Sequence, residues 1–270
     1  MTGDWKQAAK PGDRATCSVI DLGLIGYAEA YALQKRIVAA RKSGAIGDTL
    51  LFCENPHVIT QGRNGKREHL LASEHVLRQK NVEYFETSRG GDVTYHGPGQ
   101  IVGYPLLNLG AVRRDVVWYV RMLEEAMIRA TADFGLTAFR VPGKTGIWVQ
   151  AGASEEKLGA IGVHISRWVT SHGFAYNVST DLRYFDLIVP CGIADRKATS
   201  LEKILNHAVS SAEVKVALAG HFGDVFGMRM VPSTSGELME KLDAFESAPM
   251  PSADVAAVGG QEFTSQRSAG

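Results

Sequence analysis

Apolar residues recur every three to four positions in two long segments, a spacing that puts them on one face of a helix. Residues 27–44 and 115–135 are therefore predicted to be helices that end at Gly44 and Gly135. Residues 48–54 contain a continuous apolar run instead, which is typical of a strand buried on both faces. The predicted helix faces consist of Tyr27, Ala30, Tyr31, Gln34, Ile37 and Val38 in the first helix, and of Val116, Val120, Leu123, Met127 and Phe134 in the second.

Shorter apolar stretches between turn residues predict the remaining elements. Their order lacks the regular alternation of strand and helix that a doubly wound nucleotide-binding fold requires. Strands are expected at 16–23, 57–62, 82–86, 101–109, 137–141, 146–150, 157–163 and 171–178, an acidic turn at 154–156, and helical segments near 68–80, 199–208 and 212–227.

These elements predict one α/β domain with a mixed α+β sheet over residues 16–244. Residues 1–15 are polar and are expected to be flexible. Residues 245–270 are rich in Ala, Pro, Ser and Gly, a low-complexity composition that is expected to be disordered.

The composition narrows the classes of partner. Lysine plus arginine total 29, as do aspartate plus glutamate, so no general attraction to nucleic acid or to an anionic membrane is expected. No apolar run is long enough to cross a bilayer, and the polar N-terminus lacks the apolar core of a secretion signal. The 3 cysteines are not in a paired spacing, which favours a reducing, cytoplasmic compartment.

The stretch RGGDVTYHGPGQ, residues 89–100, is unusually rich in glycine. Glycine serves where a ligand or another backbone segment approaches the main chain, so a binding loop is predicted, with a tight turn between strands as the simpler alternative. Its glycines do not form a dinucleotide-binding motif, because the spacing is G-x-G-x-x-x-G and a strand with proline follows. The sequence also contains no complete phosphate-loop, zinc or serine hydrolase motif.

Cys191 and Lys157 are the candidate catalytic residues. Cys191 lies in VPCGI, where a turn would expose its thiol, whereas Cys17 and Cys53 lie in strand-like sequence that predicts buried thiols. Lys157 begins a glycine-rich apolar segment, and a partly desolvated lysine can act as a base near neutral pH. A simple turn cysteine and a solvated surface lysine are the alternatives.

Three blocks of the sequence resemble the lipoyl(octanoyl) transferase family, the octanoyl-[acyl-carrier-protein]:protein transferases of lipoate biosynthesis. They are RGGDVTYHGPGQIVGY, KLGAIGVHISRWVTSHGFAYNV and VPCGI, within a similarity that runs from about Val19 to beyond Ser200. The resemblance implies a catalytic fold like that of biotin protein ligases and lipoate ligases. It also implies that Cys191 is the acyl-thioester nucleophile and that Lys157 activates it. The implied substrate-site residues are Arg89, Gly90, Gly91, Asp92, Val93, Thr94, Tyr95, His96, Ala160, Ile161, Gly162, Gly173, Phe174 and Ala175.

The reaction that the resemblance implies moves an octanoyl group from octanoyl-acyl carrier protein to a lysine amine. The expected acceptors are lipoyl domains of 2-oxoacid dehydrogenase complexes and the glycine cleavage H protein, and the reaction is the first step of endogenous protein lipoylation. Conversion of a thioester into an amide is thermodynamically favourable, so neither ATP nor a metal or other cofactor is expected. A monomer that binds neither nucleic acid nor membrane is expected.

Three alternatives stay open at this point. An ATP-dependent lipoate or octanoate ligase on the same fold would form an acyl-adenylate and would not need Cys191. An amidotransferase would move octanoyl between two lipoyl-type proteins through the same cysteine. A non-catalytic acyl- or carrier-binding module would need neither Cys191 nor Lys157.

Other polar residues carry secondary expectations. Thr94 and His96 are expected to contact the reacting carbonyl, with a structural histidine as an equal alternative for His96. His164 and His172 are expected to be structural. The candidate docking residues for an acidic carrier, with ordinary solvated surface as the alternative, are Arg140, Lys144, Arg196 and Lys197.

Overall fold

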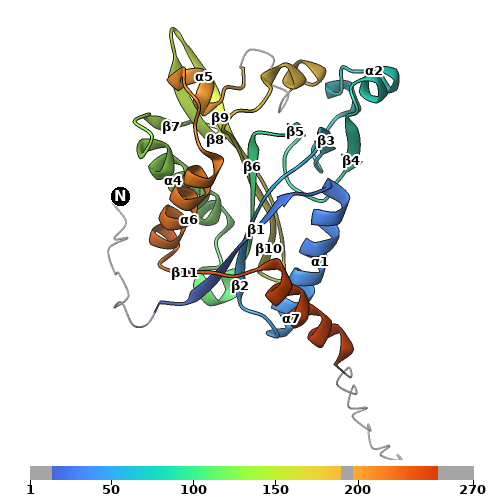
Figure 1. Cartoon of the computed structure of the whole chain (residues 1–270), viewed down its shortest axis with the longest axis vertical. Coiled ribbons are helices and arrows are strands. Elements are labelled where there is room, and N and C mark those ends of the chain that lie inside the picture. The colour runs from blue at the N-terminus through green and yellow to red at the C-terminus, as the bar shows by residue number, and fades with distance from the viewer. Residues whose placement is uncertain (1–13, 190–196, 249–270) are drawn as a thin grey trace, which may run out of the picture.

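The computed structural model describes residues 14–189 and 197–248. The strands of this part form an 8-stranded sheet in the order β11-β1-β2-β6-β10-β9-β8-β7 and a 3-stranded sheet in the order β4-β3-β5 (Figure 1). The strands are β1 (Thr16–Leu24), β2 (Asp48–Glu54), β3 (Val58–Gln61), β4 (Glu83–Glu86), β5 (Val93–His96), β6 (Gln100–Leu106), β7 (Ala138–Val141), β8 (Lys144–Ala151), β9 (Ser154–Ser166), β10 (Val169–Asn177) and β11 (Arg229–Pro232).

The large sheet is mixed, as the sequence predicted. Strand β1 pairs in parallel with β11 and β2, whereas the pairs from β2 through β6, β10, β9 and β8 to β7 are antiparallel. Strand β2 is buried along nearly its whole length, in keeping with its apolar run.

Helices cover both faces of the large sheet (Figure 1). Leu123 and Met127 of α4 pack with Phe222 of α6 in the core on one face, and Ile37 of α1 packs with Leu242 of α7 in the core on the other face. The helices are α1 (Tyr27–Ser43), α2 (Glu74–Gln79), α3 (Leu109–Val112), α4 (Val116–Ala132), α5 (Leu201–Leu205), α6 (Ser211–Phe226) and α7 (Ser235–Ser247), with 3-10 helices η1 (Arg67–His69) and η2 (Leu182–Leu187).

The small sheet has its own core and carries the glycine-rich motif. Strand β5, which contains the motif's Val93–His96, pairs antiparallel with β3, which in turn pairs in parallel with β4. Ile59, Leu77 and Tyr95 are buried in the cluster beneath this sheet.

Two local predictions were wrong. The expected helix at 68–80 is split, because the backbone N–H groups of Leu71 and Ala72 donate to Leu187 O and keep the chain extended before α2. The side chain of Ser73 then caps α2 by accepting from Val76 N. The expected acidic turn at 154–156 is the start of β9, because Gly152, at φ 60°, makes the turn two residues earlier.

The buried face of α4 and the C-terminal elements also differ from the prediction. Val116 is 45% exposed, while Tyr119 lies in the core with Leu123 and Met127, so the apolar face begins one turn later than expected. Strand β11 and helix α7 were not predicted, and α7 continues to Ser247, past the domain boundary expected at residue 244. No helix of the described residues is both long and apolar enough to span a membrane.

Candidate active site

A pocket lies between the glycine-rich motif and the α1 face of the large sheet. It encloses about 540 Å³, a volume that includes its open mouth. Twelve of the fourteen predicted substrate-site residues line it: Arg89, Gly91, Asp92, Val93, Thr94, His96, Ala160, Ile161, Gly162, Gly173, Phe174 and Ala175.

Small residues on two paired strands form the pocket floor. Ala160 of β9 lies opposite Ala175 of β10, and Gly162 lies opposite Gly173. A Cβ at Gly162 would come 2.9 Å from the carbonyl oxygen of Gly90, so the motif loop rests directly on this glycine. The absence of a side chain at Gly162 therefore lets the backbone of the motif loop approach β9 closely.

Two predicted residues do not line the pocket but support it. The N–H of Gly90 donates to Val163 O at 2.9 Å and so holds the motif loop against β9. The ring of Tyr95 is buried in the core of the small sheet, and its hydroxyl hydrogen-bonds His57 Nδ1 at 2.8 Å. Both are thus placed next to the pocket, as structural rather than lining residues.

Four further residues line the pocket without having been predicted. Val102 and Tyr104 lie two positions apart in β6, so they share a face of the strand that follows the motif. That alternation was a signal in the sequence. Tyr27 comes from the first turn of α1, and its place depends on helix packing that no local motif encodes. His172, which was expected to be only structural, also lines the pocket.

Arg89 turns back toward β3. Its Nη2 donates to Thr60 O at 2.6 Å and to Thr60 Oγ1 at 2.9 Å, and its Nη1 donates to Gly90 O at 3.1 Å. These charge-assisted bonds fix the curvature of the motif loop. The positive charge of the guanidinium also helps to lower the pKa of the pocket histidines His96 and His172.

A chain of buried hydrogen bonds continues from Thr60 through His96. Gln100 Nε2 donates to Asn177 Oδ1 at 2.9 Å, so its Oε1 accepts from His96 Nδ1 at 2.7 Å. His96 Nε2 is then the acceptor that faces Thr60 Oγ1 at 3.4 Å. At the other end, Asn177 Nδ2 donates to Thr199 O at 2.9 Å. The network ties the motif to the segment after residue 196.

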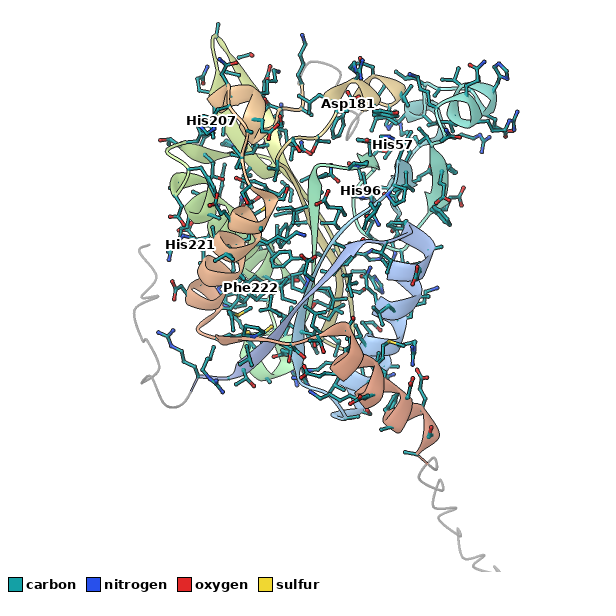
Figure 2. All side chains as sticks on the ribbon, in the orientation of Figure 1. His57, His96, Asp181, His207, His221 and Phe222 are labelled. Carbon is teal, nitrogen blue, oxygen red and sulfur yellow. The ribbon has the colours of Figure 1, made fainter. Side chains whose placement is uncertain are left out.

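The two pocket histidines are neutral at pH 7. Burial, reinforced by the nearby Arg89, lowers the pKa of His96 to about 4 and that of His172 to about 3. Figure 2 shows His96 in the small-sheet part of the molecule, near His57. His96 is therefore both hydrogen-bonded within the network and part of the pocket wall.

Lys157 lies beside a β-bulge in β9. Ile147 of β8 pairs with Gly159, but Trp148 pairs with Lys157, so Leu158 is one extra residue in β9. Lys157 is the fourth residue of this strand and was expected at its start.

The bulge decides which face Lys157 occupies. Gly159 faces α4, because a Cβ there would lie 3.2 Å from Met127 Sδ. Trp148 and Lys157 alternate to the opposite face, which also carries Ala160 of the pocket floor. Lys157 Nζ lies 4.8 Å from the centroid of the Trp148 ring, a cation–π distance. Without the bulge, Lys157 would point toward the core.

Cys191 and Arg196 lie outside the described residues. On the N-terminal side of that segment, Val189 N donates to His69 O at 2.8 Å. The imidazole of His69 in turn bonds Asp92, which lines the pocket. The chain before residue 190 is thus attached to the motif loop.

On the C-terminal side, the chain resumes next to Lys157. Lys157 N donates to Lys197 O at 2.9 Å, and Thr199 N donates to Lys157 O at 2.9 Å, so residues 197–199 extend the sheet beside β9. Asn177 holds Thr199 from the other side. The chain before the Cys191 segment is therefore linked to the pocket through His69, and the chain after it contacts Lys157 directly.

The other two cysteines are core residues, as predicted. Cys17 and Cys53 are fully buried, and burial raises the pKa of both thiols, to about 12 for Cys53. Neither thiol ionises near neutral pH, which leaves both unsuited to nucleophilic attack.

The expected basic patch is partly neutralised. The guanidinium of Arg140 contacts Glu124 at 3.1 Å and Glu125 at 2.7 Å, so its charge serves an internal ion-pair network. Lys197 is exposed, and Lys144 in β8 is partly exposed.

Comparison with known proteins places the chain in a family. The family model described as the lipoyl protein ligase A/B catalytic domain matches residues 26–223. An octanoyltransferase of Acidobacterium capsulatum is 52% identical over 237 residues, which cover 83% of this chain and 96% of the relative. The chain belongs to the octanoyltransferase family. An octanoyltransferase of Solibacter usitatus is 51% identical, over 81% of this chain and 97% of the relative. Membership identifies the chain as a transferase and confirms the resemblance seen in the sequence.

Solved structures agree on the fold. A bipartite lipoate protein ligase of Thermoplasma acidophilum superposes with a TM-score of 0.65 at 16% identity, over 86% of this chain and 93% of that one. A lipoate-protein ligase A bound with ATP gives a TM-score of 0.62 at 14% identity, over 87% and 95%. These likenesses confirm the expected lipoate-ligase-like fold.

Proposed function

We propose that this protein transfers an octanoyl group from octanoyl-acyl carrier protein to the lysine amine of lipoyl domains, through a thioester on Cys191. The observation that carries the proposal is the position of Lys157. It lies on the pocket face of β9, and its backbone bonds the chain that follows the Cys191 segment. We propose octanoyl as the acyl group because the relatives are named octanoyltransferases.

The pocket is suited to an alkyl chain bound beside a thioester. Its floor of Ala160, Gly162, Gly173 and Ala175 offers apolar contact without bulky side chains. The loop above it is fixed by Arg89 and by the hydrogen-bond chain through His96. Such a preorganised site holds the acyl group still while its carbonyl reacts.

In the first half-reaction, the Cys191 thiolate attacks the carbonyl carbon of the octanoyl thioester. The bond from that carbon to the pantetheine sulfur breaks, and Lys157 protonates the departing thiolate. The products are octanoyl-Cys191 and the free carrier thiol. A thiol of ordinary pKa, about 8.5, is only about 3% thiolate at pH 7, so a cationic neighbour increases the amount of nucleophile.

In the second half-reaction, the amine of a lipoyl-domain lysine attacks octanoyl-Cys191. An amide bond forms, the Cys191 thiolate leaves, and neutral Lys157 accepts the proton of the amine. The acceptors we propose are lipoyl domains of 2-oxoacid dehydrogenase complexes and the glycine cleavage H protein. The thioester supplies the driving force, so we propose that the reaction needs neither ATP nor a metal.

Intact-mass spectrometry tests the intermediate. The purified protein, incubated with octanoyl-acyl carrier protein, should gain one octanoyl group and lose it again when lipoyl domain is added without ATP. Cys191→Ala should gain nothing, whereas the matched control Cys17→Ala, which alters a buried thiol, should be acylated like the wild type.

Lys157→Met should form the adduct far more slowly than Lys203→Met, a control on α5 whose lysine pairs with Glu156. No adduct, together with transfer that requires ATP and free octanoate, would establish a ligase instead. Faster acylation of Cys191 by octanoyl-lipoyl domain than by octanoyl-acyl carrier protein would establish an amidotransferase instead.

A further inference from the structure

A second cleft lies beside the substrate pocket, between α1 and the end of the β9–β10 hairpin. It encloses about 770 Å³ including its open mouth. The two cavities share a wall, since Tyr31 stacks on His172 and Ser88 Oγ lies 3.2 Å from His172 Nε2. The cleft is lined by Tyr31, Gln34, Lys35, Val38, Ala39, Lys42, Ser88, His164, Ser166, Arg167 and Ser171.

The formally charged side chains that line the cleft are all positive. Lys35 and Lys42 reach it from α1 and Arg167 from the hairpin, and no aspartate or glutamate among the described residues lines it. Lys42 Nζ donates to the neutral Ser166 Oγ at 2.9 Å. Burial and the nearby Arg167 lower the pKa of Lys42, and burial with Arg63 and Lys42 nearby lowers that of His164. These groups repel one another in a protein whose total charge is balanced.

Gln34 adds an unused donor. Its side chain is 1% exposed, and its Oε1 accepts from His172 N at 2.8 Å. That bond fixes the orientation of the amide, and its Nε2 has no hydrogen-bond partner within the described residues. A buried donor without an acceptor costs free energy, so this amide is poised for a ligand atom that accepts.

The hairpin turn that supplies Arg167 is itself unusual. Arg167 and Trp168 occupy the two turn positions with φ of 51° and 63°, where glycine or asparagine is normally found. Such strain persists only where surrounding contacts hold it, and Trp168 O accepts from Leu109 N at 2.7 Å. The turn keeps a cation at the rim of the cleft.

We propose that this cleft binds a phosphate-class oxyanion, contacted by Lys35, Lys42, Arg167 and the amide of Gln34. A tetrahedral anion matches the site because it accepts hydrogen bonds on several sides and neutralises the three cations together. A water molecule could satisfy Gln34 but would leave the charge uncompensated. The site is separate from the transfer chemistry and does not depend on it.

The anion has two sources, free inorganic phosphate or the phosphate of a small metabolite. Isothermal titration at constant ionic strength, with inorganic phosphate in one arm and ribose 5-phosphate in the other, distinguishes them. Saturable binding of either probe to the wild-type protein is expected. Tighter binding of ribose 5-phosphate would identify a phosphomonoester as the ligand, and equal or tighter binding of phosphate would identify the free ion.

Variants localise the site. The double variant Lys42→Gln/Arg167→Gln should weaken binding at least fivefold, and Gln34→Glu should abolish it while keeping the acceptor for His172 N. The control Lys241→Gln removes one positive charge from the exposed face of α7 and should bind like the wild type. The double variant alters the half-buried Lys42 and the exposed Arg167, neither of which is in the core, so it remains a test even where Gln34→Glu fails to fold.

Absence of binding in both arms would overturn the proposal. Equal affinity in the wild type and the double variant would also overturn it. The same holds for an equal loss in Lys241→Gln, which would mean attraction to total charge rather than to this cleft.

Discussion

The two buried histidines of the pocket should make the protein lose stability in mild acid. Their pKa values, about 4 for His96 and about 3 for His172, lie below the 6.5 of an exposed imidazole, so the unfolded state binds their protons more tightly. Their stabilising contribution is therefore complete above pH 6.5 and is lost as the pH falls toward 4 and 3. Between pH 8 and pH 5 linkage gives a loss of about 2 kcal/mol for each histidine.

The variant His172→Asn isolates one of these contributions. Asparagine tolerates the left-handed backbone at this position, where φ is 56°. Urea unfolding followed by tryptophan fluorescence at pH 8 and pH 5 should show a pH-dependent loss about 2 kcal/mol smaller than in the wild type. The control is His207→Asn, which makes the same substitution at an exposed residue of the segment after α5; Figure 2 labels His207. An unchanged pH dependence in His172→Asn would refute the assignment of a buried, neutral imidazole.

Three further substitutions test the sheet and its network. Gly173→Ala should lower the unfolding free energy by about 2 kcal/mol, because its Cβ would lie 2.1 Å from a backbone oxygen of β6; Gly220→Ala, with open space around it, should stabilise α6 slightly in the same denaturant titration. Glu124→Gln should cost about 3 kcal/mol by leaving two arginines without their fully buried carboxylate, whereas the exposed Glu240→Gln should be neutral in thermal unfolding. Asn177→Ala should slow octanoyl transfer at least tenfold at saturating substrate, and an unchanged rate would show that the network does not position the site.

Most helices and strands could be predicted from the sequence because their signals, such as apolar periodicity and turn residues, lie within the element itself. The family resemblance, carried by the glycine-rich motif and by the sequence of β9 and β10, implied the twelve predicted residues that line the pocket. The run at 48–54 predicted β2, since a strand buried on both faces has no polar alternation.

The missed features depend on contacts between distant segments. Strand β11 has only four residues, with exposed or half-buried side chains, and it exists because it pairs with β1 more than two hundred residues away. Tyr27 enters the pocket through the packing of α1. The interruption of the helix expected at 68–80 comes from Leu187, which holds two backbone N–H groups there. No window of sequence contains both partners of such contacts.

The β-bulge at Leu158 makes the site depend on the number of residues as well as on their chemistry. Deleting Leu158 would retain every candidate catalytic side chain, yet regular alternation would then turn either Lys157 or the pocket floor toward the wrong layer. Substitutions of Leu158 keep the count and preserve the facing of Lys157. The length of β9 is thus part of the site, and deletion of Leu158 should disable the site more surely than a substitution of it.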